Sequence, residues 1–548
     1  MASIHPLLLV TVLAAPAAAQ TDIVYSIPRP AGVAHGWASR LFALPDLDGD
    51  GVGELGLGTR THGGGTVAWV HSGASGRLLF DLSVPVVSLF FGQSLVPVDD
   101  RDGDGVPDLV MVGAHSGASN SPDGWIQVHS GAHGGLLVHL TPPAGIVLAE
   151  GPAIAMGDVD GDGHTDVLCR AGPVAAIGSP HLQLFSGATG AGLYSGVVED
   201  PGSSIGNQVV RLEDHDGDGV GEFAATGRDA LGSRVDLRSG LTGHVLAVHR
   251  GPGIGLLTGN NEPLVRTPDR DGDGLDDLAV GNFFELQPGG QLGGARSFSS
   301  ATGNLLNRWG PSPSSSFFAF RMIAPGDLDL DGAEDLLTVE QQKDAQGKVI
   351  GTALVGLDLA GAAPIFTELV AELGGLYSAA LVGLPGADPE GFASFATFED
   401  GADAVRVRRY AQEVGTPYCT STANSTGKAA TMRALGSVSL AQDQLLLEAR
   451  DVVPLKPGLF FYGPDAVQLP FGSGFLCVGS SATGIARLPV GISDGSGRLA
   501  HLLDYGAPPS ATAQITAGST WHFQCWFRDP GQASGFQTSN AVLVTFLP

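Results

Sequence analysis

The chain has 548 residues, of which 15% are charged and 82 are glycine, and its formal net charge is −28. This length leaves room for more than one domain and for a sizeable core. The strongly acidic balance argues against nucleic acid and against an anionic membrane surface as partners. Few charges, many glycines and no long helical periodicity together favour an all-β fold.

Residues 1–20 have the features of a secretory signal peptide. The apolar run Leu7–Ala15 is followed by Ala17-Ala18-Ala19, an A-x-A type cleavage site, although no Lys or Arg precedes the run. A buried first strand is the alternative interpretation. No later apolar run reaches the ~18 residues that are needed to span a bilayer. We therefore expect a secreted, extracellular protein, free or held at the cell surface, with no integral membrane segment after the signal is removed.

A ten-residue acidic segment occurs six times and is the most regular feature of the chain. Each copy has acidic residues at positions 1, 3, 5 and 9, glycine at position 6 and an apolar residue at position 10. The first three acids alternate along a tight turn, so their oxygens can converge, and the glycine permits the φ > 0 backbone of such a turn. The copies are DLDGDGVGEL at 46–55, DRDGDGVPDL at 100–109, DVDGDGHTDV at 158–167, DHDGDGVGEF at 214–223, DRDGDGLDDL at 269–278 and DLDLDGAEDL at 327–336.

Each acidic segment predicts a metal site. Carboxylates packed so closely repel one another unless a cation lies among them, and hard oxygen ligands without nitrogen or sulfur select calcium. The backbone carbonyl at position 7 would complete the coordination. The segment is not an EF-hand, which needs a bidentate Glu at position 12 and flanking helices; a solvated acidic turn is the alternative for any single copy. The predicted calcium ligands are Asp46, Asp48, Asp50, Val52, Glu54, Asp100, Asp102, Asp104, Val106, Asp108, Asp158, Asp160, Asp162, His164, Asp166, Asp214, Asp216, Asp218, Val220, Glu222, Asp269, Asp271, Asp273, Leu275, Asp277, Asp327, Asp329, Asp331, Ala333 and Asp335.

The acidic segments begin at 46, 100, 158, 214, 269 and 327, so they recur every 54 to 58 residues. A period this long indicates a repeat architecture in which each unit is one supersecondary element. The second unit predicts four strands, which are Ser94–Val98, Leu109–Gly113, Trp125–His129 and Leu136–Leu140. A Gly-bearing turn follows each third strand, as SGASG at 72–76, SGAHG at 130–134, SGATG at 186–190, SGLTG at 239–243 and SATG at 300–303. Four antiparallel strands per repeat predict the blades of a β-propeller, with these turns and the acidic segments on one face.

A seventh blade is predicted after the sixth acidic segment. Residues 381–398 have the expected strands but have lost the acids, and a third strand follows at Val405–Tyr410. The fourth strand is missing locally. The N-terminal segment Ile23–Pro28 can supply it, which would close the ring and leave no open sheet edge. We therefore expect a seven-bladed β-propeller over residues 21–412.

A second, smaller unit is predicted from the end of this periodicity to the C-terminus, over residues 413–548. Its apolar segments alternate with Gly/Pro/Ser turns, which predicts a β-sandwich of about 130 residues. The expected strands include Leu445–Glu448, Gly458–Tyr462, Phe475–Val478 and Ala541–Phe546.

The series FGQSLVPVDDRDGDGVPDLVMVGA at 91–114 resembles an FG-GAP repeat, as found in the integrin-α-type β-propeller and in bacterial VCBS-type proteins. The resemblance extends over roughly residues 22–412 and begins most typically at Phe91-Gly92. It implies calcium in the loops between first and second strands, at positions 1, 3, 5, 7 and 9 only. The sixth copy departs from the pattern, because Leu330 replaces the glycine of position 4. Nothing resembles the other domains of integrins, so adhesion signalling is not implied.

The C-terminal segments YCTSTANSTG, LPFGSGFLCVG and FQCWFRDP resemble a domain found on many secreted bacterial proteins. That resemblance favours a disulfide between Cys419 and Cys477, with Cys525 as the competing partner. Four cysteines suit an exported protein with one disulfide. Cys169, on a propeller strand, is expected to be a buried apolar residue.

Evidence for catalysis is weak in the sequence. GISDG at 491–495 matches the G-x-S-x-G nucleophile motif but lies between β segments, so chance is the better explanation. Asn424-Ser425-Thr426 fits an N-glycosylation acceptor. The face opposite the acidic segments carries six aromatic residues, which would either form a platform for a protein or glycan or wedge neighbouring blades together. They are Phe90, Phe283, Phe284, Trp309, Phe317 and Phe318.

Three functions are compatible with these features. We expect a non-catalytic, calcium-stabilised interaction or adhesion scaffold whose partner is an extracellular protein or glycan. An extracellular polysaccharide-active enzyme, a lyase or hydrolase, is the first alternative, and a purely structural envelope protein is the second. The enzyme would need a cluster of charged residues on the face opposite the acidic segments, where the candidates are Arg60, His62, Arg228, Asp229 and Glu285.

Overall fold

The protein is all-β, and its sheets are antiparallel. Among the described residues, helix is limited to the short 3-10 turn η3 (Ala511–Ala513), and none is long and apolar enough to cross a membrane. The predicted signal peptide and the Phe91-Gly92 pair lie outside the described residues. The computed structural model describes residues 21–548 except 32, 34–36, 60–64, 85–88, 91–93, 116–123, 174–180, 197–203, 230, 251–262, 288, 362, 371–372, 374–379 and 482–483.

The chain divides into two compact units, of which the first is Thr21–Ala411. Its described residues form seven separate sheets. In order across each sheet, the strands are β2 (Arg40–Ala43), β3 (Leu55–Gly58), β4 (Gly65–His71), β5 (Leu78–Val84); β6 (Leu89–Phe90) and β7 (Leu95–Val98), both paired with β8 (Asp108–His115), then β9 (Trp125–His129), β10 (Leu136–Leu140); β11 (Ile146–Gly157), β12 (Asp166–Pro173), β13 (His181–Phe185), β14 (Gly192–Gly196); β15 (Ser204–Arg211), β16 (Phe223–Asp229), β17 (Gly232–Arg238), β18 (Val245–His249); β19 (Leu264–Thr267), β20 (Asp277–Leu286), β21 (Leu292–Phe298), β22 (Leu305–Trp309); β23 (Ser315–Ser316) and β24 (Met322–Gly326), both paired with β25 (Asp335–Lys343), then β26 (Val349–Leu357), β27 (Pro364–Val370); and β28 (Leu381–Gly383), β29 (Ser394–Glu399), β30 (Ala404–Arg409), β1 (Asp22–Pro28).

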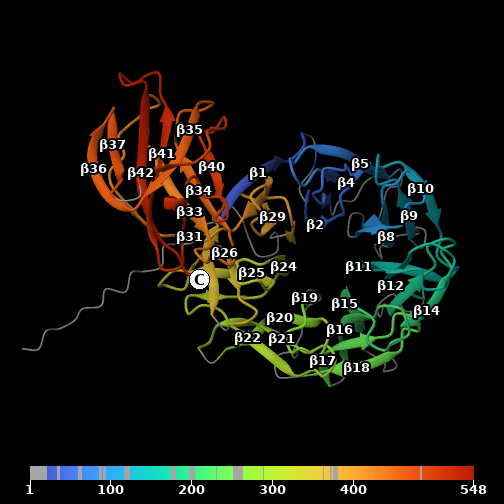
Figure 1. Ribbon diagram of the computed structural model, residues 1–548. Helices are drawn as coiled ribbons and strands as arrows, with labels where there is room; N and C mark the ends of the chain where they lie inside the picture. Colours follow the sequence, from blue (N-terminus) through green and yellow to red (C-terminus); the bar gives the residue numbers. More distant parts are fainter. Residues whose placement is uncertain are drawn as a thin grey trace, which may run out of the picture. The chain divides into compact units, whose positions relative to one another are not determined.

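The sheets of this unit follow one another around a ring in sequence order, from blue to yellow in Figure 1. First strands such as β2, β11, β15 and β19 line the inside of the ring, and last strands such as β10, β14, β18 and β22 lie outside. This arrangement is a β-propeller. The four strands predicted for the second repeat are confirmed as β7, β8, β9 and β10, although β8 begins earlier, at Asp108.

The last sheet joins the two ends of this unit. Strand β1 pairs antiparallel with β30, with Ile27 opposite Val405, so the N-terminal segment supplies the outer strand as predicted. Ile27 is buried among residues of this sheet and of the β2–β5 sheet, including Leu55 and Trp69. Burial of apolar area therefore holds the two ends of the chain segment together.

The core of the propeller consists of apolar clusters shared by neighbouring sheets. Trp309 of β22 and Phe318, beside β23, are only 2% and 1% exposed and pack in one cluster with Leu336 of β25. These two aromatics therefore wedge sheets together, and Phe317 is half-buried. The side chains of Phe90, Phe283 and Phe284 lie outside the described residues.

The second unit, Gln412–Pro548, has two main sheets around one core. Met432, Leu445 and Leu447 of one sheet pack in a single cluster with Phe460 and Phe523 of the other. The strands, in order across each sheet, are β31 (Glu413–Val414), β33 (Thr431–Gly436), β34 (Leu445–Arg450), β40 (Leu499–Leu503); β32 (Thr416–Tyr418), β42 (Phe536–Thr545), β41 (Thr520–Arg528), β35 (Pro457–Gly463) with β38 (Ala486–Arg487) and β39 (Gly491–Ile492) on its far edge; and the pair β36 (Asp465–Phe471) and β37 (Gly474–Gly479).

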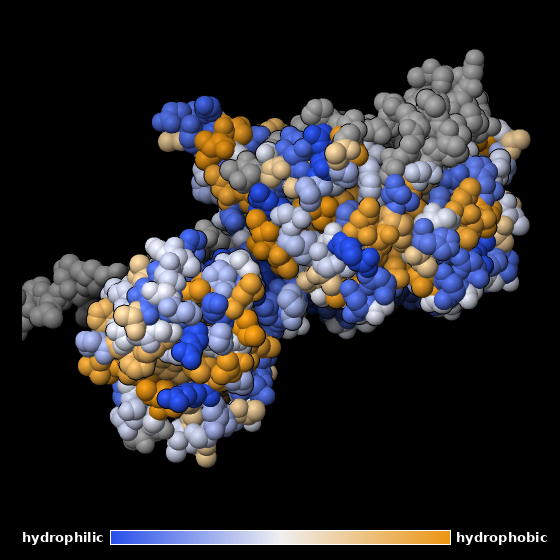
Figure 2. All heavy atoms as spheres, turned by 90° about the horizontal axis from the view of Figure 1, so that it is seen from above, coloured by the Kyte–Doolittle hydropathy of each residue, from blue (hydrophilic) through white to orange (hydrophobic). Residues whose placement is uncertain are grey.

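Outermost strands of the propeller carry exposed apolar side chains at their starts, such as Leu78, Leu136 and Leu305. On the face of the molecule that Figure 2 shows, hydrophobic residues (orange) alternate with hydrophilic residues (blue) and do not gather in a single sector. Scattered exposed apolar residues are normal for soluble proteins, so these positions alone mark no interface.

The β1 closure predicts an asymmetric response to two matched substitutions. Ile27→Ala removes a side chain that is 4% exposed, whereas Ile23→Ala in the same strand removes one that is 46% exposed. We expect the first to lower the free energy of unfolding by about 2–5 kcal/mol and the second to change it by less than about 0.5 kcal/mol. Calorimetric unfolding measures both, and equal small effects would contradict a buried β1.

Candidate metal centres in the acidic loops

Each acidic segment connects the first and second strands of its sheet. In four of the six copies the second strand begins at the ninth residue: Asp108 in β8, Asp166 in β12, Asp277 in β20 and Asp335 in β25. In the other two copies the strand begins one residue later, at β3 and β16. The loop is therefore anchored on its C-terminal side by the sheet itself.

The first acid of each loop folds the loop around its own carboxylate. In the second copy, Asp100 Oδ1 accepts a hydrogen bond from Gly103 N at 2.7 Å, and Oδ2 accepts one from Gly105 N at 2.8 Å. Both glycines have positive φ, 78° and 89°, which a side chain would strain. The same pair of bonds occurs in the loops of Asp46, Asp158, Asp214 and Asp269.

The acids at positions 1 and 3 approach each other in the first five loops, joined by position 5 in the first, fourth and fifth and by position 9 in the second, third and fourth. Asp104 Oδ1 accepts a hydrogen bond from Val106 N at 2.9 Å, which holds the fifth position against the seventh. Carboxylate oxygens of one loop approach one another within 4.8 Å in sets that the structure shows to be Asp46, Asp48 and Asp50; Asp100, Asp102 and Asp108; Asp158, Asp160 and Asp166; Asp214, Asp216, Asp218 and Glu222; and Asp269, Asp271 and Asp273.

The ninth acid has a role that the sequence did not reveal. All six of these residues are 0% exposed. In the third copy, Asp166 Oδ2 accepts from Val159 N at 2.9 Å within the loop, and Oδ1 accepts from Gly187 N at 2.8 Å in the turn after the third strand. Asp108 and Glu54 make the same two connections. In these three copies the ninth carboxylate therefore links the acidic loop to the S-G turn of its own sheet.

The S-G turn packs directly on the acidic loop. A Cβ atom on Gly131 would lie 1.8 Å from the carbonyl oxygen of Pro107, the eighth residue of the loop. A Cβ atom on Gly73, Gly187 or Gly240 would likewise lie only 1.8 to 2.0 Å from the equivalent carbonyl oxygen. The first glycine of the turn is thus required by close approach, while the second, such as Gly134, has the positive φ. The prediction that turns and acidic loops share one face is confirmed.

Some loops also contact the next sheet. Arg101, at position 2 of the second loop, donates a hydrogen bond to the carbonyl of Gly187 in the turn of the third sheet. Asp99, just before that loop, accepts from Thr165 N at 2.6 Å and contacts His164 Nδ1 at 2.9 Å in the third loop. These bonds couple neighbouring loops around the ring.

Burial and charge oppose each other in these loops. Desolvation, reinforced by nearby aspartates, raises the pKa of Asp335 to about 7 and that of Asp277 to about 6, although backbone hydrogen bonds partly offset it. At the exposed first position hydrogen bonding outweighs desolvation, and the backbone hydrogen bond from Gly105 lowers the pKa of Asp100. The ninth acids are therefore carboxylates whose ionised form lacks compensation from the protein.

The fourth loop best tests whether a cation fits. Oxygens of Asp214, Asp216, Asp218 and Glu222 all lie within 4.8 Å of one another. Among the described residues, Glu222 Oε1 is buried and has no hydrogen-bond partner, a costly arrangement for a carboxylate oxygen. Every side-chain atom that could bind a metal here is a carboxylate oxygen, the kind of ligand that a hard cation prefers. The residues present therefore fit such an ion.

The sixth loop keeps this shape despite its departure in sequence. Leu330, at position 4, adopts φ 64°, the left-handed region that glycine occupies in the other copies. Asp327 still accepts hydrogen bonds from Asp331 N and Gly332 N at 3.1 and 2.8 Å. The loop geometry therefore does not depend on glycine at position 4.

The seventh sheet corrects one expectation. Leu384 N donates a hydrogen bond to Ser394 O, and Leu44 N donates the equivalent bond to Glu54 O across the first acidic loop. Position 384 therefore corresponds to position 44, and position 394 corresponds to position 54. By this alignment the seventh connection retains acids at positions 3 and 5. They are Asp388 and Glu390, and both contact Arg409 Nη1, at 3.1 and 2.8 Å. An arginine of β30 supplies the positive charge there, which no reading of the segment alone would reveal.

The acidic candidates for polysaccharide chemistry are held in ion pairs. Asp229 binds Arg234 and Arg250, and its hydrogen bond from Arg250 lowers its pKa to about 2. Glu285 binds Arg296 at 2.6 Å and Arg308 at 2.8 Å. Arg228 lies at the end of β16, opposite Ser204. Arg60 and His62 lie outside the described residues.

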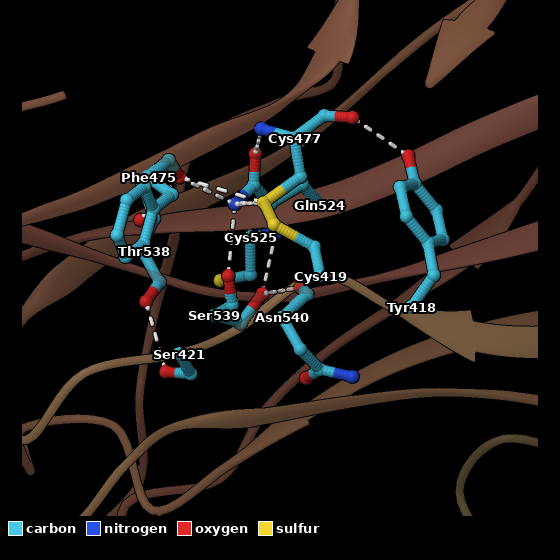
Figure 3. The surroundings of a disulfide bond; sticks show 10 residues. All are labelled: Tyr418, Cys419, Ser421, Phe475, Cys477, Gln524, Cys525, Thr538, Ser539 and Asn540. Carbon is cyan, nitrogen blue, oxygen red and sulfur yellow. Dashed lines mark hydrogen bonds between the residues drawn. A yellow bond between two sulfur atoms is a disulfide. The ribbon is translucent and has the colours of Figure 1, made fainter. Parts of the chain in front are cut away.

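A disulfide joins Cys419 to Cys477 in the second unit (Figure 3). Beside it, Tyr418 Oη donates to Cys477 O at 2.7 Å, and Gln524 Oε1 accepts from Cys477 N at 2.9 Å. Cys525 and Cys169 are buried thiols whose pKa is raised by burial, that of Cys169 to about 12. Neither thiol has the exposure or lowered pKa of a reactive cysteine.

Two short motifs of the second unit are engaged in structure. Ser493 of the GISDG segment is buried and donates to the carbonyl of Val453 at 2.7 Å, which suits a turn rather than a nucleophile. Asn424 is also buried, and its Nδ2 donates to Asp451 O at 2.6 Å. The predicted glycosylation acceptor is therefore wrong for the folded protein, because the amide that would carry the sugar is enclosed.

Comparisons with known proteins show no matching protein-family model and no matching curated protein. Among solved structures, the chain is similar to BBS1N in complex with ARL6DN, with TM-score 0.43, 10% identity, and coverage of 72% of this chain and 97% of that chain. The Dos1 propeller gives TM-score 0.37 at 12% identity, covering 72% and 88%. An exo-β-1,3-galactanase from Phanerochaete chrysosporium gives 0.28 at 10% identity, covering 82% and 95%. Likenesses this weak carry no argument about function.

Close packing of the turn on the loop predicts the effect of one added methyl group. Gly131→Ala places a Cβ against the Pro107 carbonyl, and we expect a loss of about 1–3 kcal/mol in the free energy of unfolding. Gly495→Ala is the matched control, because its Cβ would meet nothing within 4 Å. Thermal unfolding of both variants checks this, and an unchanged Gly131→Ala melt would show that the turn does not press on the loop.

The pKa of Asp335 predicts a pH dependence in the metal-depleted protein. Its pKa is about 7 when folded and ~3.9 when unfolded, so the folded state binds more protons between these values and stability falls as pH rises through them. Asp335→Asn lacks this titration. In excess chelator, we expect the stability of the unaltered protein relative to Asp335→Asn to fall from pH 5.5 to pH 8. A constant difference would contradict the raised pKa.

Proposed function

We propose that this chain is a secreted calcium-binding protein of the FG-GAP/VCBS, integrin-α-like type. In this proposal residues 21–412 form a complete seven-bladed β-propeller and residues 413–548 form a β-sandwich. The protein acts as a non-catalytic interaction or adhesion scaffold at the cell exterior, and its partner is an extracellular protein or glycan. Calcium binds in the acidic loops through the carboxylates of positions 1, 3, 5 and 9 and the carbonyl of position 7.

The observation that carries the calcium proposal is the buried Glu222 Oε1, which lacks a hydrogen-bond partner beside Asp214, Asp216 and Asp218. A divalent ion there would satisfy that oxygen and offset the repulsion among four carboxylates. The seventh connection supports the same logic, because Asp388 and Glu390 stand in the corresponding positions and have the Arg409 guanidinium between them.

The candidate catalytic acids Asp229 and Glu285 are held in ion pairs, which favours a scaffold over an extracellular lyase or hydrolase. A general acid needs a pKa near the working pH, whereas the Arg250 contact lowers that of Asp229 to about 2. Glu285 is likewise paired with two arginines. Activity of the purified protein on a panel of polysaccharides would overturn the non-catalytic assignment.

The exported location is supported by the disulfide between Cys419 and Cys477, because disulfides persist in oxidising compartments. Extracellular calcium is also concentrated enough to load modest-affinity loops. Fractionation of the native host into cytosol, envelope and medium tests this location. Stoichiometric assembly in the envelope would instead favour a purely structural role.

Calcium dependence is the direct test of the metal proposal. A site that is loaded to a hundred times its dissociation constant stabilises the fold by about 2.7 kcal/mol, so we expect the melting temperature to fall sharply in excess chelator and to recover with calcium. Glu222→Gln should lower the number of bound calcium ions by one and reduce the recovery. Glu413→Gln, at an exposed position of β31, is the matched control and should bind as the unaltered protein does. Identical melts with calcium and with chelator would sink the proposal.

A further inference from the structure

A small cavity lies where the first strands of four propeller sheets approach one another. Its volume is about 100 Å³. The lining residues belong to β15, β19, β24 and β28 or come just before these strands, and they include Gln208, Arg321, Leu264, Met322 and Leu381. These strands are the inner ones of the ring (Figure 1), so the cavity lies toward the axis of the propeller.

The cavity faces away from the acidic loops. Each first strand runs toward the loop that follows it, as β19 runs to the segment at 269 and β24 to the segment at 327. Leu264 begins β19, and Arg321 comes immediately before β24. Both residues therefore lie at the end of the ring opposite the candidate calcium sites, and the cavity shares no residue with those sites.

Positive charge gathers at this end of the axis. The Arg321 guanidinium stacks over the Phe320 ring, with its central carbon 4.8 Å from the ring centroid. Burial and, to a smaller extent, the like charge of Arg40 together lower the pKa of Arg321 to about 10. Arg40 is the first residue of β2, another inner strand, so the two cations lie at the same end.

We propose that the axial cavity binds the carboxylate of a small acidic ligand, either a simple organic acid or a uronic acid residue at the end of a sugar chain. A guanidinium binds a carboxylate through two parallel hydrogen bonds, and the Gln208 amide adds a neutral donor. Leu264, Met322 and Leu381 provide apolar contact for the attached carbon, the usual composition of a ligand pocket.

The size of the cavity limits what enters. At about 100 Å³ the cavity is small, so we expect it to hold the carboxylate of a ligand and the carbon next to it. The rest of a larger ligand would extend out of the cavity over the face opposite the acidic loops. This inference adds a ligand chemistry to the proposed scaffold but does not depend on calcium.

The test is calorimetric titration of the calcium-loaded full chain with sodium galacturonate, sodium acetate and galactose at equal ionic strength. We expect galacturonate to bind and galactose not to bind. Binding of acetate as well would identify any small carboxylate as sufficient, while binding of galacturonate alone would identify the sugar acid as the source. No binding of either acid, or equal binding of galacturonate and galactose, would overturn the proposal.

Variants assign the site. Arg321→Gln removes a charged hydrogen-bond donor pair, a loss of ~1.5–3 kcal/mol, so the dissociation constant for galacturonate should rise about ten- to a hundredfold. Arg487→Gln, at an exposed position of the second unit, should bind as the unaltered protein does. Arg321→Lys keeps the charge without the planar fork and should weaken binding severalfold, which preserves the test if Arg321→Gln does not fold. Unchanged affinity in a folded Arg321 variant would contradict the assignment, whatever the outcome for calcium.

Discussion

The burial of clustered carboxylates is the electrostatic constraint that each acidic loop has to meet. Each acidic loop brings several acids together, and its ninth acid is withdrawn completely from solvent. Burial of a charge is expensive unless hydrogen bonds and an opposite charge compensate it. Backbone amides provide the first kind of compensation, at Gly187 N for Asp166 and at Gly131 N for Asp108. The pKa of Asp335 is nevertheless raised, mainly by burial and also by the neighbouring aspartates.

The same carboxylates explain how a loop can affect a whole sheet. In the first three loops the ninth acid accepts hydrogen bonds both from its own loop and from the S-G turn, so it holds the loop and the turn of one sheet together. Arg101 and Asp99 extend these contacts to the third sheet. In the seventh sheet, Arg409 occupies the role of a cation between Asp388 and Glu390. One ring thus contains two solutions to the same electrostatic problem, an internal guanidinium and loops that suit an external ion.

The two ends of the propeller differ in chemistry. One end carries the acidic loops and their turns, and the other carries the arginine-lined cavity near the axis. The acids once considered for catalysis, Asp229 and Glu285, serve as partners of buried or half-buried arginines.

The amino-acid sequence by itself determined the repeat, the four strands of each unit and the shared face of loops and turns, because these follow from local periodicity and turn chemistry. It also predicted the pairing of β1 with β30, because the last repeat lacks a fourth strand and a ring leaves no open sheet edge. Tertiary structure alone decided the rest. The burial of the ninth acids, the need for glycine at 131 and the pairing of Arg409 with Asp388 depend on residues that are distant in the chain. The axial cavity has the same origin, since Gln208, Arg321 and Leu381 come from three sheets that meet only when the ring forms. Local patterns specify strands and turns, but contact between separate repeats is a property of the folded ring.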